Sequence, residues 1–112
     1  MTVPRWRVRL GSAAERDFAS IIAYSAETFG ARQAKVYQTT LSRALTALHA
    51  GPDLVGSVMR DEIDPGLQSL HVARNGRRGR HLILYRAAPG RIIEVVRILH
   101  DAMDFARQIP TR

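Results

Sequence analysis

The chain has no cysteine among its 112 residues, which excludes a disulfide-bonded scaffold and a thiolate metal site. It also lacks an apolar run of the roughly 20 residues that a transmembrane helix requires. Charged side chains interrupt residues 1–10, where a secretory signal peptide would carry its apolar segment. These absences favour a small cytoplasmic protein.

Lysine is nearly absent as well, because Lys35 stands beside sixteen arginines in a chain of formal net charge +7. Such a balance favours contact with nucleic acid, an acidic protein or an anionic surface, although exposed arginines are often merely solvated. Acidic residues crowd the middle of the chain, whereas nine arginines follow position 66. We therefore expect one basic face in the second half of the protein.

Hydrophobic residues make up 46% of the chain, enough for one folded domain over residues 1–112. Residues 5–10 alternate with period two, as in a half-exposed strand. Apolar side chains then recur at helical spacing over residues 12–29 and 34–48, with Ser12 as the expected N-cap and Gly30 as the break. A break this short predicts a helical hairpin.

The last third of the chain has the composition of strands. We expect a loop over residues 51–66, strands over 68–72, 81–86 and 92–101, and a short C-terminal helix over 103–109. The order β-α-α-β-β-β predicts an α+β fold in which the helical hairpin packs on one face of a small, mainly antiparallel sheet.

The last two strands flank a turn at Pro89 and Gly90, and a two-residue turn would place Leu84 opposite Val95. One sheet face would then carry Arg80, Leu82, Leu84, Arg86, Ile93, Val95, Arg97 and Leu99, and the other His81, Ile83, Tyr85, Glu94, Val96, Ile98 and His100. Both faces are substantially apolar, and the helices can cover only one. We therefore expect an apolar groove rimmed by arginines on the other, and such patches usually mark binding sites.

No motif for catalysis or metal binding is evident. The histidines are scattered and lack the spacing of metal ligands, so we expect no metal and no cofactor; they are His49, His71, His81 and His100. The strongest local charge feature is the arginine cluster Arg74, Arg77, Arg78 and Arg80. Such a cluster can bind phosphates or acidic side chains, or can simply form a solvated hairpin tip.

Two groups of short motifs carry a resemblance to a known family. The first group is Trp6-Arg7-Val8-Arg9-Leu10, Ala14-Glu15-Arg16-Asp17-Phe18, Ile22-Ala23-Tyr24, Phe29-Gly30 with Gln33-Ala34, and Tyr37. The second group is Leu84-Tyr85-Arg86, Glu94-Val95-Val96-Arg97-Ile98-Leu99-His100 and Met103-Asp104. In this order and spacing they resemble the ParE toxins of the RelE/ParE superfamily over nearly the whole chain.

The resemblance implies a toxin of a bacterial type II toxin–antitoxin pair that inhibits DNA gyrase by protein–protein contact. It also implies a partner, a ParD-like ribbon-helix-helix antitoxin whose C-terminal segment wraps the toxin. For antitoxin contact we expect Leu82, Leu84, Arg86, Ile93, Val95 and Arg97. For contact with the gyrase target we expect His100, Asp101, Met103, Asp104 and Arg107.

Two alternatives stay open. A RelE-like toxin would cut mRNA on the ribosome, with the catalytic roles falling to Arg80, Tyr85, Arg86, Arg97 and His100. Against it, alignment with the RelE pattern places Leu82 and Leu99 where a catalytic arginine and histidine would stand. A basic nucleic-acid-binding module without catalysis rests on net charge alone, because the chain lacks a recognition helix and the stacked aromatics of RNA-binding sheets.

Overall fold

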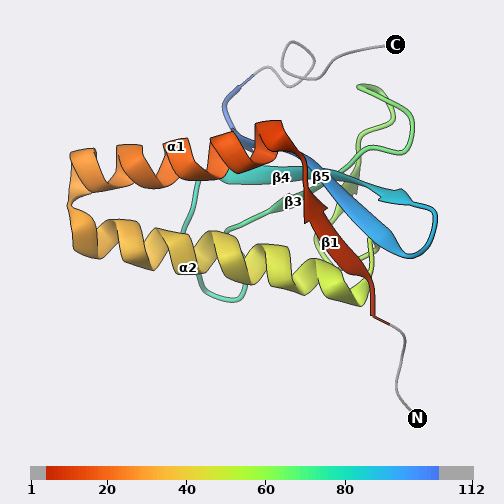
Figure 1. Cartoon of the computed structure of the whole chain (residues 1–112), viewed down its shortest axis with the longest axis horizontal. Helices are drawn as coiled ribbons and strands as arrows, with labels where there is room; N and C mark the ends of the chain where they lie inside the picture. Colours follow the sequence, from red (N-terminus) through yellow and green to blue (C-terminus); the bar gives the residue numbers. More distant parts are fainter. Residues whose placement is uncertain (1–4, 104–112) are drawn as a thin grey trace.

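The computed structural model describes residues 5–103. The elements are β1 (Arg7–Leu10), α1 (Ser12–Phe29), α2 (Ala31–Ala47), a 3-10 turn η1 (Leu48–Ala50), β2 (Val58–Met59), β3 (Gln68–His71), β4 (His81–Ala88) and β5 (Ile92–His100). The two helices form a hairpin against one face of the sheet, and their connecting turn lies away from the strands (Figure 1). The predicted α+β fold is confirmed. The predicted helix over residues 103–109 lies almost entirely outside the described residues.

The sheet has five strands in the order β1-β5-β4-β3-β2. β1 pairs with β5 in parallel, and the other three pairs are antiparallel, so the predicted mainly antiparallel character is correct. The strand that the sequence did not predict is β2, which lies within the expected loop and pairs Val58 with Ser69. Two residues are too few to produce a readable alternation.

The helix boundaries differ from the prediction at one end. Ser12 is the first residue of α1 and not its N-cap, which is Gly11 without a side-chain cap. The Gly11 N–H donates to the carbonyl oxygen of Val95 at 3.0 Å, which extends the pairing with β5 up to the residue where the helix starts. Gly30 separates the helices as expected, with φ of 93°.

The predicted register of the β4–β5 hairpin is wrong by one residue. Ala88 pairs with Ile92, so the turn has three residues and ends on Arg91 with a positive φ of 56°. Tyr85 therefore lies opposite Val95, and a bulge between Leu84 and Tyr85 shifts the register again further along. Because of this slip, Ile93 and Val95 lie on the sheet face opposite to the predicted one, together with Tyr85. Beyond the bulge, Arg97 and Leu99 pair with Leu84 and Leu82 and share their face, as predicted.

Each sheet face has its own apolar cluster. The helix-side cluster holds the buried residues Ala14, Leu41, Ala44, Leu48, Leu70, Val72, Ile83, Tyr85, Ile93, Val95 and Ile98. The opposite cluster holds Leu67, Leu84 and Leu99, with Ile63 and Val96 packed against it. Leu67 and Ile63 belong to the segment 60–67, which we call the strap. Because the strap buries this second cluster, the expected open apolar groove on the second face is wrong.

Candidate functional site

Three large apolar side chains of the helical hairpin are exposed to solvent. Tyr24 is 64% exposed, Phe29 63% and Val36 52%. Together with Ile21 they line one wall of a groove of about 1120 Å³, which we call the hairpin groove. The opposing wall comes from the β3–β4 connection and carries Arg77, Arg78 and Arg80, and Tyr37, His81 and His100 also line the groove.

The β3–β4 connection is held against α2 by its sequence. Asn75 and Gly76 take positive φ values of 54° and 78°, which turns the chain sharply back toward the helix. A Cβ atom on Gly79 would lie 2.5 Å from a methyl group of Val72 and 3.1 Å from the Tyr37 ring, so only glycine fits this approach. Arg77 also donates to the Thr40 hydroxyl at 3.2 Å. The basic wall is therefore a positioned element and not a solvated hairpin tip.

A tyrosine–histidine pair lies in the groove. The Arg80 N–H donates to the Tyr37 hydroxyl oxygen at 3.1 Å, and the same oxygen lies within hydrogen-bond distance of Nδ1 of His81, at 2.5 Å. Burial, followed by the proximity of His100, lowers the pKa of His81 to about 4, while burial raises the pKa of Tyr37. Both groups are neutral at pH 7.

Asp101 ties three strands together beside this pair. Its carboxylate accepts from Nε2 of His71 at 3.0 Å and from Nε of Arg80 at 3.1 Å. Nδ1 of His71 accepts the Ala73 N–H at 2.9 Å, which confirms that Nε2 is the donor. The hydrogen bonds from His71 and Arg80 lower the pKa of Asp101. Its negative charge is therefore already satisfied within the protein.

The residues expected to contact the antitoxin do not share a surface in this chain. The apolar members are all buried; they are Leu82, Leu84, Ile93 and Val95. Ile93 and Val95 belong to the helix-side cluster, and Leu84 belongs to the opposite one. Arg86 donates to the buried Asp64 at 2.7 Å and so clasps the strap to β4. Arg97 donates to Asp17 of α1, with its Nε 2.7 Å from the carboxylate. Both arginines therefore take part in contacts that hold the fold together.

The five residues assigned to RelE-like catalysis do not lie together in one site. Tyr85 is fully buried, and its hydroxyl donates to the Pro52 carbonyl oxygen at 2.6 Å. Of the five, only Arg80 and His100 line the hairpin groove. The partners that meet them there, Tyr37 and His81, were not recognised as site residues. They lie 44 positions apart, and only the fold brings them together.

The residues expected to contact the target gather at the end of β5 where the structure describes them. His100 lines the hairpin groove, Asp101, next to it in the sequence, accepts from His71 and Arg80, and Met103 is 40% exposed. Asp104 and Arg107 lie outside the described residues. No group of three histidine, aspartate or glutamate side chains suited to a metal ion occurs within residues 5–103. None of the helices described is long and apolar enough to cross a membrane.

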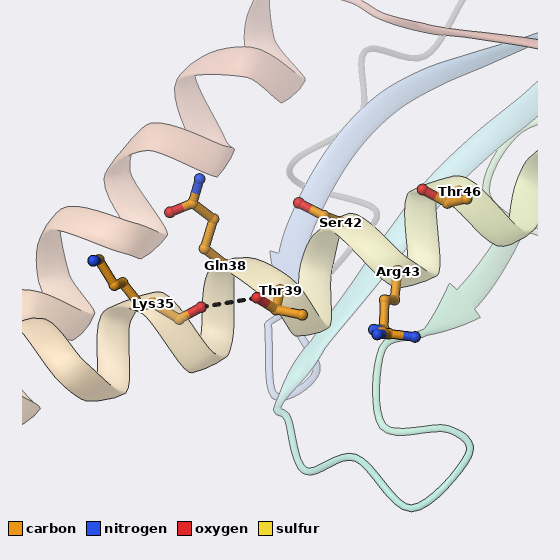
Figure 2. Close-up of a pocket in the computed structure, with 6 residues that line it drawn as sticks. All are labelled: Lys35, Gln38, Thr39, Ser42, Arg43 and Thr46. Atoms are coloured by element: carbon orange, nitrogen blue, oxygen red, sulfur yellow. Dashed lines mark hydrogen bonds between the residues drawn. The ribbon is translucent and has the colours of Figure 1, made fainter.

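A second, shallower depression of about 420 Å³ lies along α2. Its lining consists of Lys35, Gln38, Thr39, Ser42, Arg43 and Thr46 (Figure 2). The Thr39 hydroxyl donates to the Lys35 carbonyl oxygen of the same helix at 3.2 Å, as the dashed line in Figure 2 marks. All six residues come from one helix, and none of them lines the hairpin groove.

Comparison with known proteins identifies the family. The model of the ParE toxins of the type II toxin–antitoxin system parDE matches residues 8–105. The chain belongs to the ParE toxin family. Toxin ParE1 of Mycobacterium tuberculosis is 31% identical over 103 residues, which cover 92% of this chain and 97% of that toxin. This protein is therefore a toxin of the type II toxin–antitoxin class.

Solved structures support the ParE fold. A chain of the chromosomal ParDE system from P. aeruginosa superposes with a TM-score of 0.65 at 17% identity, covering 85% of this chain and 95% of that one. A chain of the RelBE2 toxin–antitoxin complex from Mycobacterium tuberculosis gives a TM-score of 0.58 at 22% identity, covering 91% of this chain and 98% of that one. Two helices on a five-stranded mixed sheet are thus the shared architecture of these toxins.

Proposed function

We propose that this ParE-family toxin inhibits DNA gyrase by protein–protein contact and is neutralised by a ParD-like antitoxin. The observation that carries the proposal is the family match over residues 8–105. The arrangement of the described residues supports contact over chemistry, because the arginines best placed on the sheet for catalysis are paired with Asp64 and Asp17. Our proposed gyrase contact remains His100 at the end of β5 together with Asp101, Met103 and, outside the described residues, Asp104 and Arg107.

For the antitoxin we propose the hairpin groove as the principal site. The sheet residues first expected to bind it are buried, whereas the groove exposes Tyr24, Phe29 and Val36 opposite Arg77 and Arg78. A segment carrying both aliphatic and acidic side chains would cover the apolar wall and pair with the arginines. That composition fits the acidic, amphipathic tail expected of an antitoxin partner.

The gyrase mechanism is tested by pulse-labelling DNA and protein synthesis in parallel after induced expression in bacteria. We expect DNA synthesis to fail first, and the purified toxin to block supercoiling by gyrase in vitro. If protein synthesis fails first, the gyrase proposal is wrong and cleaved mRNA should be mapped instead. That outcome would favour the RelE-like alternative.

The antitoxin site is tested with a matched pair of valines. Val36→Glu places a negative charge inside the groove, and Val55→Glu makes the same change at a side chain that is 92% exposed and outside it. We expect Val36→Glu to weaken binding of the ribbon-helix-helix protein encoded beside the toxin gene by at least about tenfold, or 1.4 kcal/mol. Val55→Glu should leave the dissociation constant unchanged. Equal affinities for both variants would remove the groove from the interface.

A further inference from the structure

The groove contains imidazole nitrogens that have no partner among residues 5–103. The Ala102 N–H donates to Nδ1 of His100 at 3.1 Å, so the neutral His100 ring carries its proton on Nε2. Neither this Nε2 nor that of His81 meets a partner within the described part of the chain, and the His100 side chain is 45% exposed. His100 can therefore donate from Nε2 to a bound anion, and His81 can do the same when its proton lies on Nε2.

These donors lie close together on paired strands. His81 and His100 are directly opposite each other in the β4–β5 ladder, with ring centroids 5.4 Å apart in an edge-to-face arrangement. Arg78, exposed on the adjoining wall, adds a guanidinium group with five N–H donors. A single carboxylate has two oxygens and about four acceptor sites, enough for both imidazoles and a guanidinium.

No aspartate or glutamate is among the described residues that line the groove. Asp101, outside the lining, has a carboxylate oxygen 3.6 Å from Nδ1 of His100 and also accepts from His71 and Arg80, and Asp17 of α1 accepts from Arg97 and the Ile98 N–H. Within the described residues, Arg77 and Arg78 have no carboxylate partner, so the groove favours an anion from outside the chain.

We infer that His81, His100 and Arg78 form an oxyanion site that receives a side-chain carboxylate of the segment docked in the hairpin groove. The inference rests on the proposed antitoxin function for the identity of that segment. A carboxylate on a peptide is favoured over a phosphate on nucleic acid because the site adjoins an apolar wall of Ile21, Tyr24, Phe29 and Val36. Aliphatic side chains of a peptide would cover that wall, and a sugar–phosphate backbone would leave it exposed.

The first test uses the full-length toxin alone. Its imidazole C–H signals are followed by NMR during titration with sodium acetate and sodium phosphate, with sodium chloride at matched ionic strength as the control. We expect saturable shifts for His81 and His100 at tens of millimolar, and none for His49, whose Nδ1 contacts the Trp6 carbonyl oxygen at 2.8 Å outside the groove. Shifts no larger than those with chloride, or equal shifts at His49, would overturn the site. Neither gyrase nor antitoxin takes part, so failure here is distinct from failure of the proposed function.

The second test separates peptide from nucleic acid and uses matched arginines. Arg78→Gln should weaken binding of a synthetic peptide of alternating glutamate and leucine about three- to tenfold, and Arg43→Gln, on the outer depression of α2, should not. His100→Asn, which removes an imidazole donor, should weaken that affinity as well. Saturation of the same signals by a single-stranded DNA oligonucleotide at lower concentration than by the peptide would overturn the carboxylate assignment.

Discussion

The two faces of the β4–β5 hairpin are closed by different parts of the chain. One face packs against α1 and α2, which derive from a continuous stretch and bury an extended cluster around Ile83 and Ile98. The other is closed by the strap, where Leu67 and Ile63 cover Leu84 and Leu99. The helices provide more area than the sheet can cover, and their connecting turn lies away from the strands (Figure 1). The part of the helices that extends past the sheet lines the hairpin groove, which is the surface proposed for antitoxin binding.

The largest loss in the free energy of unfolding should follow from a cavity in the helix-side cluster. Ile83 is fully buried in the main cluster, and Ile83→Ala should lower the free energy of unfolding by about 4 kcal/mol. Urea denaturation measures this loss. Because helices and sheet share this core, we expect one cooperative transition at a lower midpoint. A loss below about 1 kcal/mol would mean that the helices do not depend on this face.

The matched change on the other side is Leu84→Ala, at the neighbouring and equally buried residue. We expect a smaller loss of about 3 kcal/mol, because the short strap can settle into the space left behind. Hydrogen exchange should accelerate in residues 60–71 and stay slow in α1 and α2. Antitoxin affinity should be unchanged, and a weakened complex would indicate that the strap side takes part in binding.

The ion pair between Asp64 and Arg86 tests how firmly the strap is held. Asp64→Asn should cost about 2 kcal/mol, because it leaves a largely buried guanidinium without its counter-charge. The matched control is Glu94→Gln, which removes the exposed ion pair with Arg9 from the same sheet. That change should cost less than about 0.5 kcal/mol. Equal losses in the free energy of unfolding, measured by urea denaturation, would contradict the role of Arg86 in holding the strap to β4.

The smallest loss of stability should come from lowering the pH, and it arises from His81 in the hairpin groove. The folded-state pKa of His81, about 4, lies below the ordinary value of 6.5, so the unfolded chain binds more protons between these values. Stability from this group is full above about pH 6.5 and falls as pH drops toward 4. We expect a loss of about 1 kcal/mol between pH 7 and 5, since the half-exposed ring is partly screened.

The histidine itself provides the test of this pH effect. His81→Asn should flatten the decline in stability between pH 7 and 5, as measured by urea denaturation at the two pH values. An unchanged slope in His81→Asn would assign the acid sensitivity to other groups.

The sequence predicts elements better than their pairing. Helical spacing and strand composition are local, and they identified both helices and the β3, β4 and β5 strands. The register failed because Arg91 occupies a left-handed conformation that a non-glycine residue seldom takes, and because a bulge leaves no periodic trace. The groove could not be predicted from residues alone, since Tyr37 meets His81 only after α2 and β4 pack together.

The parallel pairing of β1 with β5 determines how late in synthesis the fold can be completed. Arg9 meets Glu94 across 85 positions, so β1 stays unpaired until β5 has left the ribosome. The helical hairpin forms from local contacts, but its cluster lacks Ile93, Val95 and Ile98 until that moment. The complete fold, with both sides of the sheet covered, therefore forms only after β5 has emerged, late in the synthesis of the described residues.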